Sequence, residues 1–291
     1  MMEFENGNIG AVIKRKREIM GLSQDELAAG IVPRLALVRL ESNQVFLPML
    51  AIERLLSKLD IGSEDINEFY QDFEDYDRFM KRQIINNQLR KGETEDVRKL
   101  SAIYRRTLSD GDRLELQEIK RIEAEADLID GKMHEMTPLL TRHIYEMTGR
   151  SMFDGCDLYS ETEAFLIFMF FLTAGLKGNI RMAVSGLDYL ESNISEKKAC
   201  RNKERLLFDI HFAKALFFEK LNNLKKASEE FRKTSRFCRC ACIRDIKKLY
   251  WHVKKLPCNI ISEDKKLKAF LGDETSLIKI LQECSEGAEK R

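Results

Sequence analysis

The feature that most constrains this chain is a pair of short helical segments near its start, joined by a glycine. Ser23 can cap a helix, and Glu26 three residues later completes a capping box. Gly30 then permits a sharp turn, and Pro33 suits the first position of the next helix. Two short helices closed by a tight glycine turn predict a small helical bundle at this end of the chain.

Helices are also expected on both sides of this pair. Asn8 can cap a helix over residues 8–20, whose apolar residues recur at helical spacing until Gly21 ends it. The helix over residues 33–41 is closed by Asn43, a residue type that tolerates a left-handed backbone. A fourth helix opens at Pro48, and its apolar stripe breaks at residues 60–63. Residues 1–63 therefore form one predicted domain, a helix-turn-helix bundle.

From residue 64 onward the chain is expected to consist of longer helices. Charged residues make up 33% of the sequence and there are only 4 Pro, a composition that favours helices over strands. Helices are predicted over residues 64–89, 93–109, 112–130, 135–148, 161–176, 180–192, 198–221, 224–240, 242–255, 263–271 and 274–284. Gly92, Gly111 and Gly131 mark breaks between the first of them. Helix pairs with short connections predict a solenoid, and the fold class is all-α.

One helix pair carries the pattern of a tetratricopeptide unit. Over residues 218–231, Ala227 allows two helices to approach closely and Phe231 fills the groove between them. Asn222 stands where that repeat prefers Gly. Residues 64–291 are therefore predicted to form a tetratricopeptide-like domain.

The third helix of the bundle is the predicted DNA-reading element. In a helix-turn-helix this helix enters the major groove while the second helix braces against the backbone. With Leu37 and Leu40 buried, Arg34 can reach guanine, and Leu35 and Val38 can meet thymine methyl groups. Gln24 is placed to contact a phosphate. The candidate DNA-binding residues are Lys14, Arg15, Lys16, Ser23, Gln24, Arg34, Leu35, Val38, Arg39 and Asn43.

The overall charge does not favour nucleic acid, because 49 basic residues nearly cancel 48 acidic ones. DNA binding therefore depends on a local patch, and residues 14–17 form one. Arg17 is expected to pair with Glu41 and tie the first helix to the third. Lys14, Arg15 and Lys16 are then the better phosphate contacts.

No catalytic motif is found: there is no glycine-rich phosphate loop, no HExxH and no nucleophile elbow. We expect neither an enzyme nor a cofactor. The start lacks the features of a secretory signal, and the apolar run over residues 165–176 is too short to cross a bilayer, so a cytoplasmic protein with reduced thiols is expected. A zinc site is an alternative interpretation of Cys238, Cys240 and Cys242, which His252 or Cys258 could complete. Because the usual CxxC pairs are absent, we predict no metal site.

The N-terminal segment resembles the phage-repressor type of helix-turn-helix, and specifically that of the Rgg/MutR regulators. The residues that carry the resemblance are Ile9-Gly10, Arg17, Gly21-Leu22-Ser23-Gln24, Glu26-Leu27-Ala28, Gly30-Ile31, Leu37, Arg39 and Glu41. Residues 157–165 and 218–231 look like the regulatory domain of the same family. Members of this family are pheromone-responsive transcription regulators of Gram-positive bacteria.

The resemblance implies a homodimer whose helical repeats bind a short secreted peptide that has been taken back into the cell. Candidate peptide contacts are Arg142, Arg150, Phe168, Phe171, His211, Lys214, Phe218 and Asn222, for whose aromatic members ordinary core packing is the competing interpretation. The last helices and the long helix after Glu64 are places to look for the dimer surface. No cysteine precedes residue 155, so the covalent dimer link of some members is not expected.

The reading helix departs from the family pattern, which carries serines where this chain has Pro33, Leu35 and Val38. A second hypothesis follows from this difference. The chain would then be a helical-repeat interaction scaffold with a degenerate helix-turn-helix. Loss of DNA binding on exchange of Arg34 and Arg39 separates the two hypotheses.

Overall fold

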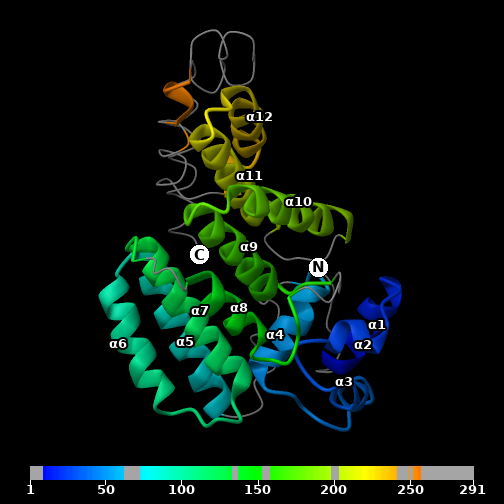
Figure 1. Cartoon of the computed structure of the whole chain (residues 1–291). Helices are drawn as coiled ribbons and strands as arrows, with labels where there is room; N and C mark the ends of the chain where they lie inside the picture. The colour runs from blue at the N-terminus through cyan, green and yellow to red at the C-terminus, as the bar shows by residue number, and fades with distance from the viewer. Residues whose placement is uncertain are drawn as a thin grey trace. The chain divides into compact units, whose positions relative to one another are not determined.

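The computed structural model describes residues 9–61, 73–132, 137–152, 158–197, 203–240, 249 and 252–256, and in these residues every regular element is a helix (Figure 1). The α-helices are α1 (Ile9–Ile19), α2 (Gln24–Ala28), α3 (Arg34–Glu41), α4 (Met49–Lys58), α5 (Phe73–Lys91), α6 (Thr94–Arg105), α7 (Arg113–Ile129), α8 (Thr137–Glu146), α9 (Glu161–Leu176), α10 (Ile180–Lys197), α11 (Lys203–Lys220) and α12 (Leu224–Ser235). A 3₁₀ turn follows at Cys238–Cys240. The all-α prediction is confirmed.

The chain divides into two compact units. Unit 1 comprises Met1–Ala174 with Ser192–Arg201, and unit 2 comprises Gly175–Glu191 with Asn202–Arg291. The first four helices belong to unit 1 together with α5 to α8, and α4 packs against both α5 and α7. The predicted domain boundary at residue 63 lies outside the described residues and stays a prediction.

The N-terminal bundle folds as its local sequence predicts. Ser23 caps α2 in a capping box, since its side chain accepts from the Glu26 N–H while Glu26 accepts from the Ser23 N–H. Gly21, Gly30 and Asn43 all adopt a left-handed backbone, with φ of 67°, 73° and 56°. The core is formed by apolar side chains from all four helices, chiefly Ile13, Leu27, Leu37, Leu40, Ile52, Leu55 and Leu56. Asn8, the predicted cap of α1, lies outside the described residues.

Helices α5 to α8 pack one after another along the chain. Helices α5, α6 and α7 share a core that contains Ile85, Val97, Ile119 and Ile122. The connections turn at Gly92 and Gly131, with φ of 81° and 68°, where the sequence predicted breaks. Helix α9 is the most apolar of the described helices, yet none of these helices is long and apolar enough to cross a membrane.

Unit 2 contains the helix pair with the tetratricopeptide pattern. Helix α11 packs along α12, and their shared core includes Phe208, Ala215, Ala227 and Phe231. Asn222 turns the chain between them with a φ of 56°, as the sequence predicted. The predicted helices over residues 263–271 and 274–284 lie outside the described part of the chain, as does most of the one over residues 242–255.

Candidate DNA-binding surface and its contacts with the helical repeats

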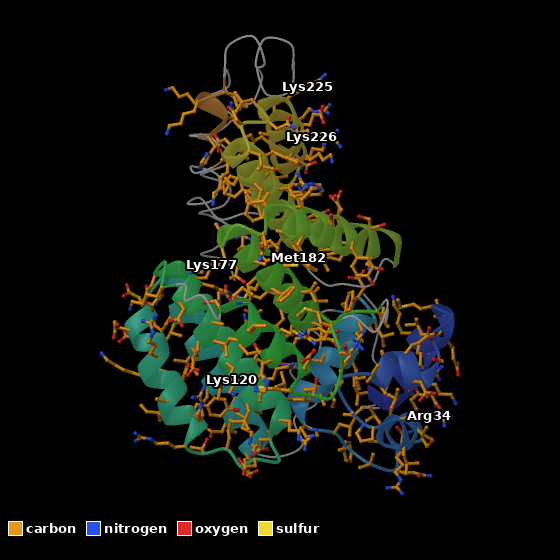
Figure 2. All side chains as sticks on the ribbon, in the orientation of Figure 1. Arg34, Lys120, Lys177, Met182, Lys225 and Lys226 are labelled. Atoms are coloured by element: carbon orange, nitrogen blue, oxygen red, sulfur yellow. The ribbon has the colours of Figure 1, made fainter. Side chains whose placement is uncertain are left out.

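The predicted reading helix α3 presents one face to solvent. Leu37 and Leu40 are buried in the bundle core, while Arg34, Leu35 and Arg39 are exposed on the opposite side. Figure 2 shows the Arg34 side chain at the outer edge of the bundle. Val38 is half-buried, and Asn43 is exposed just after the helix. A helix supported on one face and free on the other has the geometry required for insertion into a groove.

Helix α3 is held to α1 by a buried ion pair, as the sequence predicted. Arg17 donates from Nε to Glu41 Oε1 at 2.6 Å and from Nη2 to Oε2 at 2.9 Å. Its third nitrogen donates to the Leu22 carbonyl at 2.9 Å. Burial by itself would raise the pKa of Glu41, but the hydrogen bonds from Arg17 and Gln24 bring its pKa below the usual value. The pair fixes the orientation of the exposed face.

The other candidates of the DNA surface differ in how free their side chains are. Lys14 and Arg15 are exposed on α1, and Lys16 is half-buried. Gln24 donates from Nε2 to Glu41 Oε2 at 2.8 Å, and the Ser23 hydroxyl is engaged in the capping box. Contact of either side chain with a phosphate would therefore exchange an internal hydrogen bond for an external one.

The turn between α2 and α3 lies directly against a buried ion pair from later in the chain. Arg150 donates to Glu163 Oε1 at 2.5 Å and to the Leu158 carbonyl at 3.1 Å. A Cβ on Gly30 would come within 2.7 Å of Glu163 Oε1 and 3.1 Å of Arg150 Cδ. Glycine is therefore needed at residue 30 for its backbone conformation and for its lack of a side chain.

Lys58 contacts the same carboxylate from α4. Its Nζ is fully buried, donates to the Ala29 carbonyl at 2.7 Å and lies 3.9 Å from Glu163 Oε2. That oxygen also accepts from the Ser160 N–H and hydroxyl at 2.8 and 2.9 Å. Burial by itself raises the pKa of Glu163, yet the charges of Lys58 and Arg150 bring the pKa below its usual value. One carboxylate at the start of α9 thus joins the turn between α2 and α3 to the later helices of unit 1.

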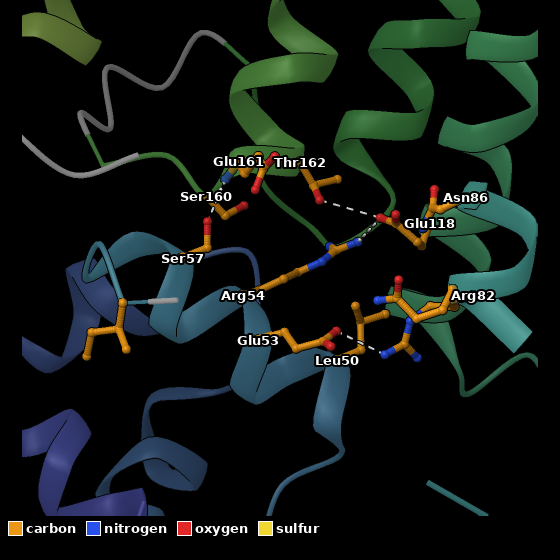
Figure 3. Close-up of a pocket in the computed structure, with 12 residues that line it drawn as sticks. Leu50, Glu53, Arg54, Ser57, Arg82, Asn86, Glu118, Ser160, Glu161 and Thr162 are labelled. Carbon is orange, nitrogen blue, oxygen red and sulfur yellow. Dashed lines mark hydrogen bonds and ion pairs between the residues drawn. The ribbon is translucent and has the colours of Figure 1, made fainter. Parts of the chain in front are cut away.

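A second buried network joins α4 to α5 and α7 (Figure 3). Arg54 donates to Gln117 and, at 3.2 Å, to Glu118 Oε2. Arg82 donates to Glu53 at 2.9 Å and to Glu115 at 2.5 Å. These pairs were not predicted, because their members are 29 to 64 residues apart and each looks like an ordinary charged helix residue.

A polar cavity of about 160 Å³ lies beside this network. It is lined from α4, α5, α7 and the start of α9, and Figure 3 shows Arg54 extending across it. The Arg54 side chain is buried, and its Nε has no hydrogen-bond partner among the described residues. The size and polarity of the space fit several water molecules, which would satisfy that nitrogen.

Four of the predicted peptide contacts lie in unit 1. Arg142 is exposed and pairs with Glu146 at 2.9 Å on its own helix, whereas Arg150 is buried in the pair with Glu163. Phe168 and Phe171 are buried side chains of α9. Both phenylalanines therefore pack as core residues do, and their contact with a peptide stays a prediction.

The other four lie in unit 2. His211 and Lys214 are buried beside Glu230, at 2.8 Å and 3.5 Å, and Lys214 also contacts Asp188 and Glu191. Burial by itself raises the pKa of Glu230, but the hydrogen bonds from His211 and Lys233 and the charge of Lys214 lower it to about 2. Phe218 is half-buried under the Lys226 ammonium, and Asn222 is exposed in the turn. Of the eight candidates, His211 and Lys214 contact a common partner, the Glu230 carboxylate.

The cysteine cluster gives no metal geometry in the part of the chain that is described. Cys238 is buried, whereas Cys242 and Cys258 lie outside the described residues. Among the described side chains, no group of three or more His, Cys, Asp and Glu could hold a metal ion.

The observed class is an all-helical protein with an N-terminal helix-turn-helix bundle followed by tetratricopeptide-like helical repeats. No family model matches the chain, and no curated protein matches it. Among solved structures it is similar to Bacillus thuringiensis PlcR, crystallised in complex with the peptide PapR7 and DNA. The match covers 94% of this chain and 96% of PlcR at 14% identity, with a TM-score of 0.52. The likeness establishes the fold over nearly the whole length.

Proposed function

We propose that this chain is a DNA-binding transcription regulator that acts inside the cell as a homodimer and is controlled by a short signalling peptide. The observation that carries the proposal is the exposed face of α3, held in a fixed orientation by the buried Arg17–Glu41 pair. The fold shared with PlcR, a protein crystallised with a peptide and DNA, supports both parts of the proposal. Membership of the Rgg/MutR regulators is the more specific hypothesis.

Base reading is assigned to Arg34, Leu35 and Val38. Arg34 is exposed and only 3.5 Å from the exposed carboxylate of Asp25. An ion pair between two exposed side chains contributes little, so Arg34 can leave it for a guanine edge at small cost. Leu35, exposed on the same face, suits a thymine methyl group. Lys14, Arg15, Lys16 and Arg39, with the polar side chains of Ser23, Gln24 and Asn43, complete the surface as phosphate contacts.

Peptide control requires a physical connection between the repeats and the reading helix. Glu163 provides one within unit 1, because it stands at the start of α9 and touches the Gly30 turn, Lys58 and Arg150 together. A displacement of α9 would break buried charge contacts at the turn that orients α3. The peptide itself is proposed to bind the helical repeats, where the candidates remain Arg142, Arg150, Phe168, Phe171, His211, Lys214, Phe218 and Asn222.

A gel-shift titration against the DNA upstream of the gene tests the DNA-binding part. We expect a shifted band that weakens as salt rises, because phosphate contacts release counterions. Arg34→Ala should weaken DNA binding by roughly 1–3 kcal/mol, about 5- to 150-fold. Lys99→Ala, at an α6 side chain that is 71% exposed, is the matched control and should leave DNA binding unchanged. Absence of binding at every promoter tried, or binding that ignores both salt and Arg34, would contradict the proposal.

The second candidate function is a helical-repeat interaction scaffold with a degenerate helix-turn-helix. It is favoured by the apolar character of the reading face, where Leu35 is 58% exposed. The scaffold predicts that exchange of Arg34 and Arg39 for Ala leaves partner binding unchanged. The regulator predicts that the same double variant loses its DNA while retaining its circular dichroism spectrum.

A further inference from the structure

A polar cavity within unit 1, beside α4, takes no part in the proposed DNA surface. Its volume is about 160 Å³, and it is lined from α4, α5, α7 and the start of α9 (Figure 3). Arg54 forms part of its buried wall, whereas Glu161 is exposed and marks the side open to solvent. A cavity of about 150 Å³ can hold a benzene-sized molecule, so this one has room for a small ligand. A ligand that extends past Glu161 can be larger.

One hydrogen-bond donor of the cavity wall lacks an acceptor. Arg54 Nε is buried and has no hydrogen-bond partner among the described residues. The two terminal nitrogens of Arg54 are engaged, one with Gln117 and the other with Glu118 Oε2 at 3.2 Å. Because a buried donor without an acceptor is destabilising, Arg54 Nε favours an occupant of the cavity that carries an acceptor oxygen. Water supplies such an oxygen, and so does a ligand that replaces the water.

One acceptor of the lining has too few donors. Glu53 accepts a hydrogen bond from Arg82 at its Oε2, at 2.9 Å, whereas its Oε1 has no partner among the described residues. Burial raises the pKa of Glu53 although the charge of Arg82 acts in the opposite direction. A raised pKa is expected of a buried carboxylate with few donors, so a hydroxyl that donated to Oε1 would stabilise the ionised form.

Two further polar side chains of the lining have hydrogen-bonding capacity to spare. Ser57 Oγ accepts from the Glu161 N–H at 2.9 Å, and its own proton has no acceptor among the described residues. Asn86 Oδ1 accepts from Arg121 at 3.2 Å, which leaves its Nδ2 to donate. Leu50 adds apolar surface to the same lining. The cavity therefore offers several donors, one acceptor and an apolar contact.

The two arginines of the described lining already have carboxylate partners. Arg54 pairs with Glu118 at 3.2 Å, and Arg82 pairs with Glu53 at 2.9 Å. Glu161 adds a negative charge at the open side, which disfavours an anionic ligand. A cationic ligand would lie beside the Arg54 guanidinium, whose unpaired nitrogen donates and cannot accept. Burying an unpaired charge is far more costly than burying a neutral group that makes hydrogen bonds, so the lining favours a neutral ligand.

We propose that this cavity binds a small neutral polyhydroxyl molecule, a polyol or a monosaccharide. A hydroxyl oxygen accepts and donates hydrogen bonds, so separate hydroxyls of one molecule can accept from Arg54 Nε and donate to Glu53 Oε1. Others meet Ser57 and Asn86, and the C–H groups between them contact Leu50. A primary amide also has an acceptor and a donor, but it has too few such groups to engage all four polar side chains. A ligand of this kind is additional to the proposed signalling peptide, and its binding does not depend on the proposed function.

Saturation-transfer NMR of the full chain tests the class of ligand. The probes are glucose, ribose and inositol, each at about 10 mM, and dissociation constants of roughly 0.1–10 mM are expected for those that fit. Gluconate and glucosamine, the anionic and cationic relatives of glucose, and acetamide should bind at least about tenfold more weakly. Lack of saturation transfer to all three neutral probes overturns the proposal. Binding of gluconate, glucosamine or acetamide that equals or exceeds theirs also overturns it.

Asn86→Leu tests the place of binding. It should weaken the tightest-bound probe about five- to tenfold, because it removes a hydrogen-bond donor from the lining. Asn87→Leu is the matched control, since Asn87 is exposed on the same helix outside the described lining, and it should leave the affinity unchanged. Glu53→Gln is a second variant, in which Arg82 keeps Glu115 at 2.5 Å, and it should weaken the same probe about three- to tenfold.

Thermal melting by circular dichroism verifies that each variant is folded at the temperature of the binding assay. Unchanged affinity in both Asn86→Leu and Glu53→Gln, or an equal loss in Asn87→Leu, overturns the assignment of the ligand to this cavity. None of these measurements uses DNA or peptide, so the polyol site and the proposed function can fail separately.

Discussion

Gly30→Ala is the substitution whose effect is best determined by the structure. The residue has a φ of 73°, and a Cβ would lie 2.7 Å from the buried Glu163 carboxylate. The left-handed backbone alone costs a non-glycine residue about 1–2 kcal/mol. Displacing a buried carboxylate from its partners adds about 1–3 kcal/mol. We expect Gly30→Ala to lower the free energy of unfolding by roughly 2–5 kcal/mol.

Gly21→Ala is the matched control within the same bundle. Its φ is 67°, but nothing lies within 4 Å of the added Cβ, so only the backbone cost of about 1–2 kcal/mol applies. Urea unfolding followed by far-ultraviolet circular dichroism measures both variants. Most of the excess loss in Gly30→Ala should disappear when Glu163 is also replaced by Ala, because only the 3.1 Å approach to Arg150 Cδ then remains. Equal losses in the two glycine variants would refute the proposed contact of the turn with Glu163.

Three further changes test other parts of the structure. Lys58→Met should lower the free energy of unfolding by roughly 2–4 kcal/mol in the same urea assay, because it removes the donor to the Ala29 carbonyl and a positive charge beside Glu163. A decrease of less than about 1 kcal/mol would contradict this prediction. Burial by itself would raise the pKa of Glu118, but the charges of Arg121 and Arg54 lower this pKa to about 2. The ionised Glu118 therefore stabilises the folded state fully above its ordinary pKa of 4.5, and this contribution is lost as the pH falls toward 2. Glu118→Gln should therefore be less stable than the wild type at neutral pH and should flatten the decline of stability between about pH 5 and 2; an unchanged pH profile would argue against the depressed pKa. Residue 222 has a φ of 56°, a left-handed backbone that glycine adopts freely and valine does not. Asn222→Gly should therefore melt at or slightly above the wild-type temperature, and Asn222→Val should melt several degrees lower. Similar melting temperatures of the two variants would show that the left-handed backbone at residue 222 is not required.

The N-terminal bundle could be predicted from the sequence because its determinants are local. The Ser23–Glu26 capping box and the left-handed residues Gly30 and Asn43 each follow from residue type within a few positions. The Arg17–Glu41 pair spans 24 residues, yet it too was predicted, because the order of the helices brings α1 beside α3. Asn222 was predicted for the same local reason in a distant part of the chain.

The contacts that join the bundle to the repeats could not be predicted, since no periodicity distinguishes a buried charged residue from an exposed one. Lys58 ends an amphipathic helix where a cation is ordinarily solvated, and Glu163 stands in a first turn where an acidic residue is ordinary too. Packing α9 against the glycine turn buries both, and each then satisfies the other. A sequence motif would have been recognisable, but this connection consists of residue types that are common at helix ends, and only their burial is unusual. Because the same carboxylate lies against the turn that precedes α3, we expect a ligand that moves the start of α9 to displace the proposed reading helix through a contact the sequence does not reveal.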